Sequence, residues 1–64
     1  MDWNQIVKIY AESNHLTVSQ VKHEIRTGWI DRDMLFDAWL VYEGIIGYTG
    51  SILTVLEEIE THMK

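Results

Sequence analysis

The chain has 64 residues and no cysteine, and ten Asp and Glu oppose five Lys and Arg to give a formal net charge of −5. The missing cysteines exclude disulfides and thiolate metal sites, and the acidic balance argues against a protein dedicated to binding phosphate backbones. Apolar residues make up 47% of the chain, which is too many for intrinsic disorder. Because so short a chain buries only a small core, we expect one domain that depends on helix packing, self-association or both.

The first expected element is a helix over residues 2–13. Asp2 suits the N-cap, where a short polar side chain accepts a hydrogen bond from the first turn. Four apolar residues then recur at the i, i+3, i+4 and i+7 spacing of one helical face. These residues are Trp3, Ile6, Val7 and Tyr10. The polar residues 13–15 end the pattern.

A second helix is expected over residues 17–27, where the local signals are strongest. Thr17 and Gln20 have the spacing of a capping box, in which each side chain accepts a hydrogen bond from the other residue's backbone N–H. Gly28 stands where helices commonly end with a left-handed glycine. Arg26 in the last turn suits the negative end of the helix dipole.

Two further helices are expected over residues 31–46 and 51–62. Asp31 suits the positive dipole end at the start of the first, and Ser51 or Thr49 can cap the second. The expected fold is therefore all-α, a bundle of three to four helices forming a single domain over residues 1–64, and we expect dimerisation to complete the bundle.

The segment between the last two expected helices contains Gly44, Gly47 and Gly50. Apolar residues continue across it at alternating spacings of four and three, the seam of one long helix. The seam consists of Met34, Ala38, Val41, Ile45, Tyr48, Ile52, Val55 and Ile59. Three glycines cost about 3 kcal/mol relative to alanine inside a helix. We therefore expect a break or sharp kink near residues 47–50, with one continuous helix as the alternative.

No motif in the chain indicates catalysis. A phosphate-binding loop needs a lysine directly after its second glycine, and no lysine lies between Lys22 and Lys64. Glu58 and His62 share a helix face, but two ligands do not make a metal site. We expect a protein that is not an enzyme, with no catalytic residue, no cofactor and no metal.

The stretch "IVKIYAESNHLTVSQVKHEI", residues 6–25, is similar to the helix-turn-helix pattern of DNA-binding proteins. It has a small residue, a polar turn, an apolar residue and a Thr cap, but His15 stands where that pattern usually has glycine. The resemblance implies that residues 17–27 form a recognition helix. Its candidate DNA contacts are Ser19, Lys22, His23 and Arg26.

The chain holds more apolar side chains than a monomer of this size can cover, and exposed apolar patches usually mark a partner surface. The candidate protein-interface residues are Phe36, Trp39, Leu40, Tyr42, Ile46, Leu53 and Leu56. We expect a homodimer or a groove for another protein. The acidic end of the chain, Glu57, Glu58 and Glu60, would steer association with a basic surface.

The run "DAWLVYEGIIGYTGSI", residues 37–52, resembles tracts in short uncharacterised proteins of phages and prophages of Gram-positive bacteria. This resemblance implies a small regulatory role exerted through binding. We expect a small acidic interaction module that regulates or inhibits a macromolecular partner, with a helix-turn-helix DNA-binding regulator as the alternative.

The least charged part of the chain, residues 38–56, approaches the length of a membrane span, and its one charged residue is Glu43. Three glycines and several hydroxyl side chains dilute it, and no Lys or Arg cluster flanks it. The first residues have no basic stretch followed by an apolar run, as a signal peptide would. We expect no membrane partner and a location in the cytoplasm of a bacterial host.

Overall fold

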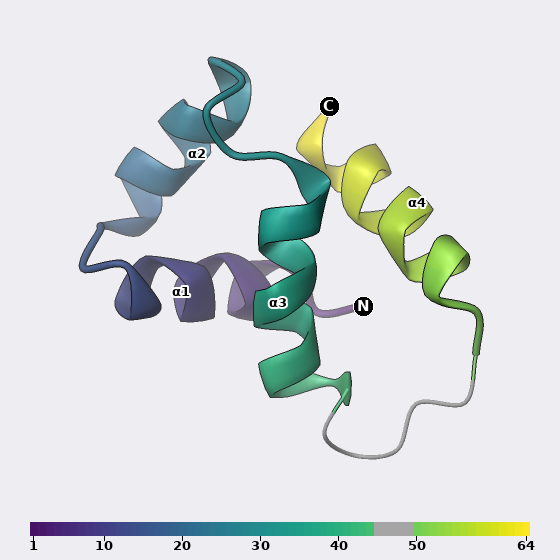
Figure 1. The fold of residues 1–64 in the computed structure, drawn as a ribbon. Coiled ribbons are helices and arrows are strands. Elements are labelled where there is room, and N and C mark those ends of the chain that lie inside the picture. Colours follow the sequence, from purple (N-terminus) through teal and green to yellow (C-terminus); the bar gives the residue numbers. More distant parts are fainter. Residues whose placement is uncertain (45–49) are drawn as a thin grey trace.

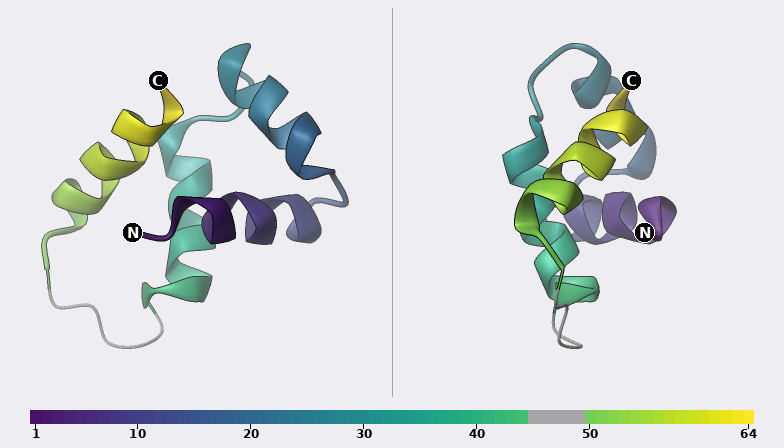
Figure 2. Two further views of the ribbon diagram at one scale, coloured as in Figure 1. Left: turned by 180° about the vertical axis from the view of Figure 1, so that it is seen from behind. Right: turned by 90° about the vertical axis from the view of Figure 1, so that its right-hand side faces the viewer.

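A computed structural model, which describes residues 1–44 and 50–64, places the chain in four helices and no strands over those residues. The helices are α1 (Trp3–Ser13), α2 (Val18–Arg26), α3 (Arg32–Tyr42) and α4 (Ile52–Met63). Helix α1 runs across α3, while α2 and α4 lie on opposite sides of α3 (Figures 1 and 2). The expected all-α class is confirmed.

The first three helices begin at residues whose side chains accept a backbone hydrogen bond from the first turn. The bonds run from the N–H of Gln5 to Asp2 (3.3 Å), of Gln20 to Thr17 (3.1 Å) and of Met34 to Asp31 (3.0 Å). The capping box at Thr17 is only half formed, because the Gln20 amide donates to the carboxylate of Glu24 at 3.2 Å. Ser51 holds the N-cap position of α4 without a side-chain bond.

Helices α1 and α2 end in the same way, with one residue in the left-handed conformation. The residue is His15 (φ 57°) after α1 and Gly28 (φ 84°) after α2. The next residue in each case donates back to a carbonyl in the last turn, from Leu16 to Ala11 at 2.8 Å and from Trp29 to Glu24 at 2.9 Å. This is the Schellman motif, and it confirms the helix-ending role predicted for Gly28.

Helix α3 ends at Tyr42, four residues before its predicted end, and α4 begins at Ile52. The two helices run in different directions, so the alternative of one long helix is wrong (Figure 1). The predicted positions of the break, at Gly47, and of the second cap, at Thr49, lie in residues 45–49, outside the described residues.

The seam predicted through α3 and α4 is not one buried stripe. Ala38 is 6% exposed and Ile59 is fully buried, but Met34, Val41 and Ile52 are 37%, 57% and 58% exposed. Within α3, Met34, Ala38 and Val41 line the same hollow, but only Ala38 is covered by neighbouring residues. After α3 the change of direction ends the regular spacing (Figure 1).

The core lies where α1 crosses α3, and α4 covers one side of it. Its buried members are Ile6, Val7, Ala11, Val21, Ile30, Leu35, Ala38, Trp39, Val55 and Ile59. Helix α2 contributes a single buried residue, Val21.

A carboxylate after α3 ties the start of the chain to the core. Glu43 accepts the backbone N–H of Asp2 at 2.8 Å through Oε1 and the indole N–H of Trp39 at 3.0 Å through Oε2. On the other side of the molecule Arg32 pairs with Glu60 at 2.8 Å and joins the start of α3 to α4.

None of the helices in the described ranges has the length and apolarity that crossing a membrane requires.

Candidate functional site

The four residues predicted to contact DNA all lie exposed on α2. Ser19, Lys22, His23 and Arg26 point away from the side that carries Val21 into the core. The turn before α2 contains one backbone feature of the helix-turn-helix pattern. His15 adopts the positive φ that glycine usually supplies at this place, so the departure from the pattern is one of residue type and not of backbone conformation.

A hollow of about 220 Å³ lies beside this helix and involves three helices. It is lined by Trp3, Lys22, Ile25, Arg26, His62 and Met63. The rings of Trp3 and His62 stack with centroids 5.2 Å apart and planes 9° apart. Sequence reasoning did not place Trp3 and His62 here, because residues that far apart in the chain give no local signal of their contact.

The residues predicted for a protein interface differ in their exposure to solvent. Leu40, Tyr42 and Leu53 are 42%, 39% and 58% exposed. Leu56 is half-buried, and Ile46 lies outside the described residues. Trp39 is only 2% exposed.

The rings of Phe36 and Trp39 explain part of this outcome. Phe36 is half-buried and stacks on Trp39, with centroids 5.4 Å apart. Because Trp39 belongs to the core, we do not retain it as an interface residue. Its indole N–H donates inside the fold, to Glu43.

Two of the predicted residues nevertheless remain together at the surface. Phe36 and Leu40 line a hollow of about 200 Å³ between the end of α3 and the start of α4. Ile52, two glycines and the core residue Trp39 complete its wall.

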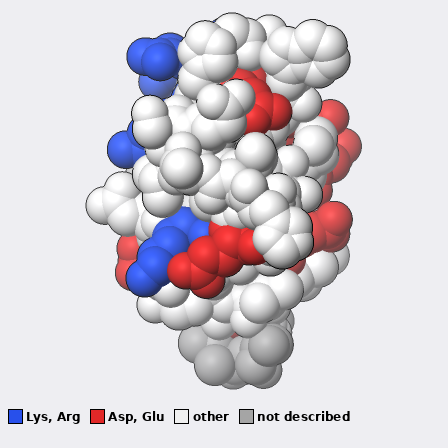
Figure 3. Space-filling view, turned by 90° about the vertical axis from the view of Figure 1, so that its left-hand side faces the viewer, with Lys and Arg blue, Asp and Glu red and all other residues white. Residues whose placement is uncertain are grey.

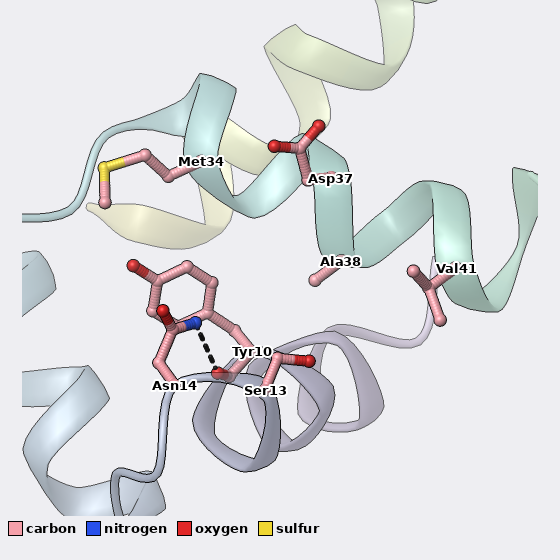
Figure 4. Close-up of a pocket in the computed structure, with 7 residues that line it drawn as sticks. All are labelled: Tyr10, Ser13, Asn14, Met34, Asp37, Ala38 and Val41. Carbon is pink, nitrogen blue, oxygen red and sulfur yellow. Dashed lines mark hydrogen bonds between the residues drawn. The ribbon is translucent and has the colours of Figure 1, made fainter.

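A larger hollow, of about 280 Å³, lies between α1 and α3, and we call it the α1–α3 groove. Its lining is Tyr10, Ser13, Asn14, Met34, Asp37, Ala38 and Val41. Tyr10 and Asn14 rise from α1, Ala38 points down from α3, and Asp37 stands at the outer rim, turned away from α1 (Figure 4). The Asn14 amide donates to the carbonyl of Tyr10 at 2.9 Å and holds the end of α1 in place.

The solvent side of α3 continues this groove outward. We call it the α3 outer face, and it consists of five exposed residues, Asp33, Met34, Asp37, Leu40 and Val41. Three apolar side chains thus alternate with two carboxylates on one helix. The sequence reasoning assigned Met34 and Val41 to a buried seam, because spacing alone does not tell which side of a helix a neighbour covers.

The two charged residues of the α3 outer face, Asp33 and Asp37, are both acidic. The chain has six acidic residues and no Lys or Arg between residues 33 and 63. Asp37 forms no hydrogen bond or ion pair with a described residue. The pKa of Tyr10 is raised by burial and by the charges of Glu24 and Asp31.

Positive charge lies elsewhere. On the side of the molecule where α2 lies, Lys and Arg side chains follow one edge and Asp and Glu follow the opposite edge, and the two signs meet low on the face (Figure 3). Helix α2 carries Lys22 and Arg26, and neither pairs with a described residue.

No group of three or more potential metal ligands occurs within residues 1–44 and 50–64. Comparisons with family models, curated proteins and solved structures give no match to this chain. The geometry of its surfaces is therefore the basis for a functional proposal.

Proposed function

We propose that the protein is a small interaction module that binds a protein partner through the α3 outer face and the adjoining α1–α3 groove. The observation that carries this proposal is the exposure of Met34, Leu40 and Val41 on a helix whose other exposed residues include two unneutralised carboxylates. Apolar side chains grouped at a surface and rimmed by polar residues are typical of interaction sites.

The chemistry of the face indicates the chemistry of the partner. An apolar side chain of the partner would fill the groove against Tyr10 and Ala38. A Lys or Arg beside it would meet Asp37, which has no partner of its own among the described residues. The six acids of the C-terminal half would speed the encounter with such a basic surface. The partner is therefore a basic protein that presents an apolar anchor.

The acids also bear on self-association. A symmetric dimer that paired this face with itself would bring Asp33 and Asp37 of the two copies close together, and like charges facing each other are costly. We therefore assign the α3 outer face to a different protein. The resemblance of residues 37–52 to small phage proteins suggests a bacterial host protein in the cytoplasm, regulated or inhibited by this binding.

The proposal can be tested by capture with the immobilised chain from bacterial extract, followed by quantitative mass spectrometry. We expect a basic protein that is retained by the wild type and lost with both Val41→Ser and Asp37→Asn. Trp29→Ser is the matched control, since Trp29 is 77% exposed but lies outside the face. A protein captured equally by all variants would contradict the proposal. So would a concentration-dependent dimer that Val41→Ser dissociates.

A second function, DNA binding by α2, is favoured by a separate observation. The left-handed His15 and the exposure of Ser19, Lys22, His23 and Arg26 match a helix-turn-helix with α2 as recognition helix. The experiment is a low-salt gel shift with genomic fragments. Lys22→Ala and Arg26→Ala should weaken a complex whose affinity falls as salt increases. The absence of any complex at low salt would end this second proposal.

A further inference from the structure

The hollow beside α2 collects positive charge in a protein of net charge −5. Lys22 and Arg26 border it from α2, and His62 borders it from α4. No acidic residue lines it. None of these three side chains forms a hydrogen bond or ion pair with a described residue.

A neighbouring hollow provides an internal comparison. It shares Ile25 and Met63 with the first, but its cation, Arg32, pairs with Glu60 at 2.8 Å, and Asp31 also lines it. One hollow thus has its positive charge neutralised within the fold, and the other does not. The positive charge of the hollow beside α2 is therefore available to a ligand.

Trp3 gives the hollow shape and a further donor. Its ring stacks on His62 nearly in parallel, which holds the imidazole beside Lys22 and Arg26. The indole N–H of Trp3 has no acceptor among the described residues. Ile25 and Met63 supply apolar walls that reduce the contact of the charges with water.

We propose that this hollow binds a phosphate group of a DNA backbone, an inference that rests on DNA binding by α2. Arginine binds phosphate oxygens through its planar fork and lysine binds them as a point charge, and both side chains line this hollow. The volume, about 220 Å³, is below the roughly 300–1,000 Å³ of sites for drug-sized ligands. One phosphate with its neighbouring sugar fits, and the base remains outside.

The first test is an NMR titration of the full chain with inorganic phosphate against potassium chloride at equal ionic strength. We expect the Trp3 indole N–H resonance to shift and saturate with phosphate and not with chloride. Arg26→Gln should abolish the response. Arg32→Gln is the matched control, because this arginine is already paired with Glu60, and it should leave the response intact. Equal responses to the two salts, or a response retained in Arg26→Gln, would overturn the inference.

The second test uses a short DNA duplex at low salt, followed by fluorescence anisotropy. We expect Trp3→Phe, which keeps an aromatic ring but lacks the N–H, and His62→Gln each to weaken binding about three- to ten-fold. The effect should be similar for different sequences, as for other phosphate contacts. Circular dichroism confirms that each variant is folded.

The outcomes separate this inference from the function on which it rests. A DNA complex that is unaffected by Trp3→Phe and His62→Gln would overturn the assignment of a phosphate site to the hollow and leave DNA binding by α2 in place. A specific phosphate response without any DNA complex would refute DNA binding and identify a free phosphate as the ligand. A phosphoserine peptide that binds where DNA does not would likewise overturn the DNA assignment.

Discussion

His15 and Gly28 occupy the same place after α1 and α2, and both are left-handed. Glycine adopts this conformation without steric cost, whereas a residue with a Cβ loses roughly 1–2 kcal/mol. The first helix end is therefore strained and the second is not. The left-handed conformation at His15 accompanies the local bond from the Leu16 N–H to the Ala11 carbonyl, which closes the turn between α1 and α2.

We predict that His15→Gly stabilises the protein. Removal of the Cβ relieves the strain, and the greater chain entropy of glycine offsets part of the gain. The net increase in unfolding free energy should be about 0.5–1 kcal/mol, measured by thermal or urea denaturation. Gly28→Ala should lower the unfolding free energy, because an alanine is strained at this positive φ. The loss would come from the backbone conformation alone, since nothing lies within 4 Å of an added Cβ. Destabilisation by His15→Gly would contradict this account of the turn.

Glu43 provides a second prediction at the residue scale. Its carboxylate accepts bonds from both Asp2 and Trp39, and hydrogen bonds to charged groups contribute about 1.5–3 kcal/mol. Glu43→Ala should lower the unfolding free energy by about 2 kcal/mol, while Glu43→Gln, which keeps one acceptor oxygen, should cost less. Urea denaturation followed by tryptophan fluorescence measures both. Equal losses would indicate that the packing of the side chain matters more than its hydrogen bonds.

At the scale of elements, α4 shows how one helix divides its tasks. Val55 and Ile59 are 3% and 0% exposed and attach α4 to α3. Leu53 is 58% exposed, and two acids, Glu57 and Glu60, follow it at i+4 and i+7 on the same side. The helix is held mainly by its inner residues, and of these outer residues Glu60 alone pairs with a described residue, Arg32.

This division predicts unequal costs of truncation in α4. Ile59→Ala should destabilise by about 2–5 kcal/mol, because it removes buried methylene groups and leaves a cavity. Leu53→Ala should change the unfolding free energy by less than about 0.5 kcal/mol, as expected for an exposed site. Denaturation midpoints of the two variants compare them directly. A large cost for Leu53→Ala would place that side chain in a contact that its exposure does not indicate.

At the scale of the whole molecule, charge is segregated. Residues 33–63 hold six acids and no Lys or Arg, while the unpaired cations Lys22 and Arg26 lie on α2. Such a distribution gives the protein two surfaces of different character, one acidic and apolar, the other basic. It also makes the acids repel one another, which lowers the stability of the folded state.

We therefore predict that salt stabilises this protein and that Glu57→Lys does so as well. The substitution removes repulsion between Glu57 and Glu60, which are one helical turn apart, and should raise the unfolding free energy by about 0.5 kcal/mol. The melting temperature of the variant should also depend less on potassium chloride concentration. A steeper salt dependence in Glu57→Lys would contradict the proposed repulsion.

The sequence alone determined the helices, because helix starts and ends depend on local chemistry. Caps at Asp2 and Thr17 and a left-handed Gly28 could be predicted from the side-chain and backbone preferences of those residues. The exposure of the candidate DNA contacts of α2 could also be predicted from the sequence. A short helix with a single buried residue, Val21, leaves most of its other side chains in solvent.

Only the tertiary structure decided which apolar residues the core takes. Met34 and Val41 fit the spacing of a buried seam and lie exposed, while Trp39 was expected at an interface and lies in the core. Hydrophobic spacing gives the faces of a helix but not the neighbour that covers each face, because that depends on how α1 and α4 cross α3. For the same reason the stacking of Trp3 on His62 could not be predicted from the sequence.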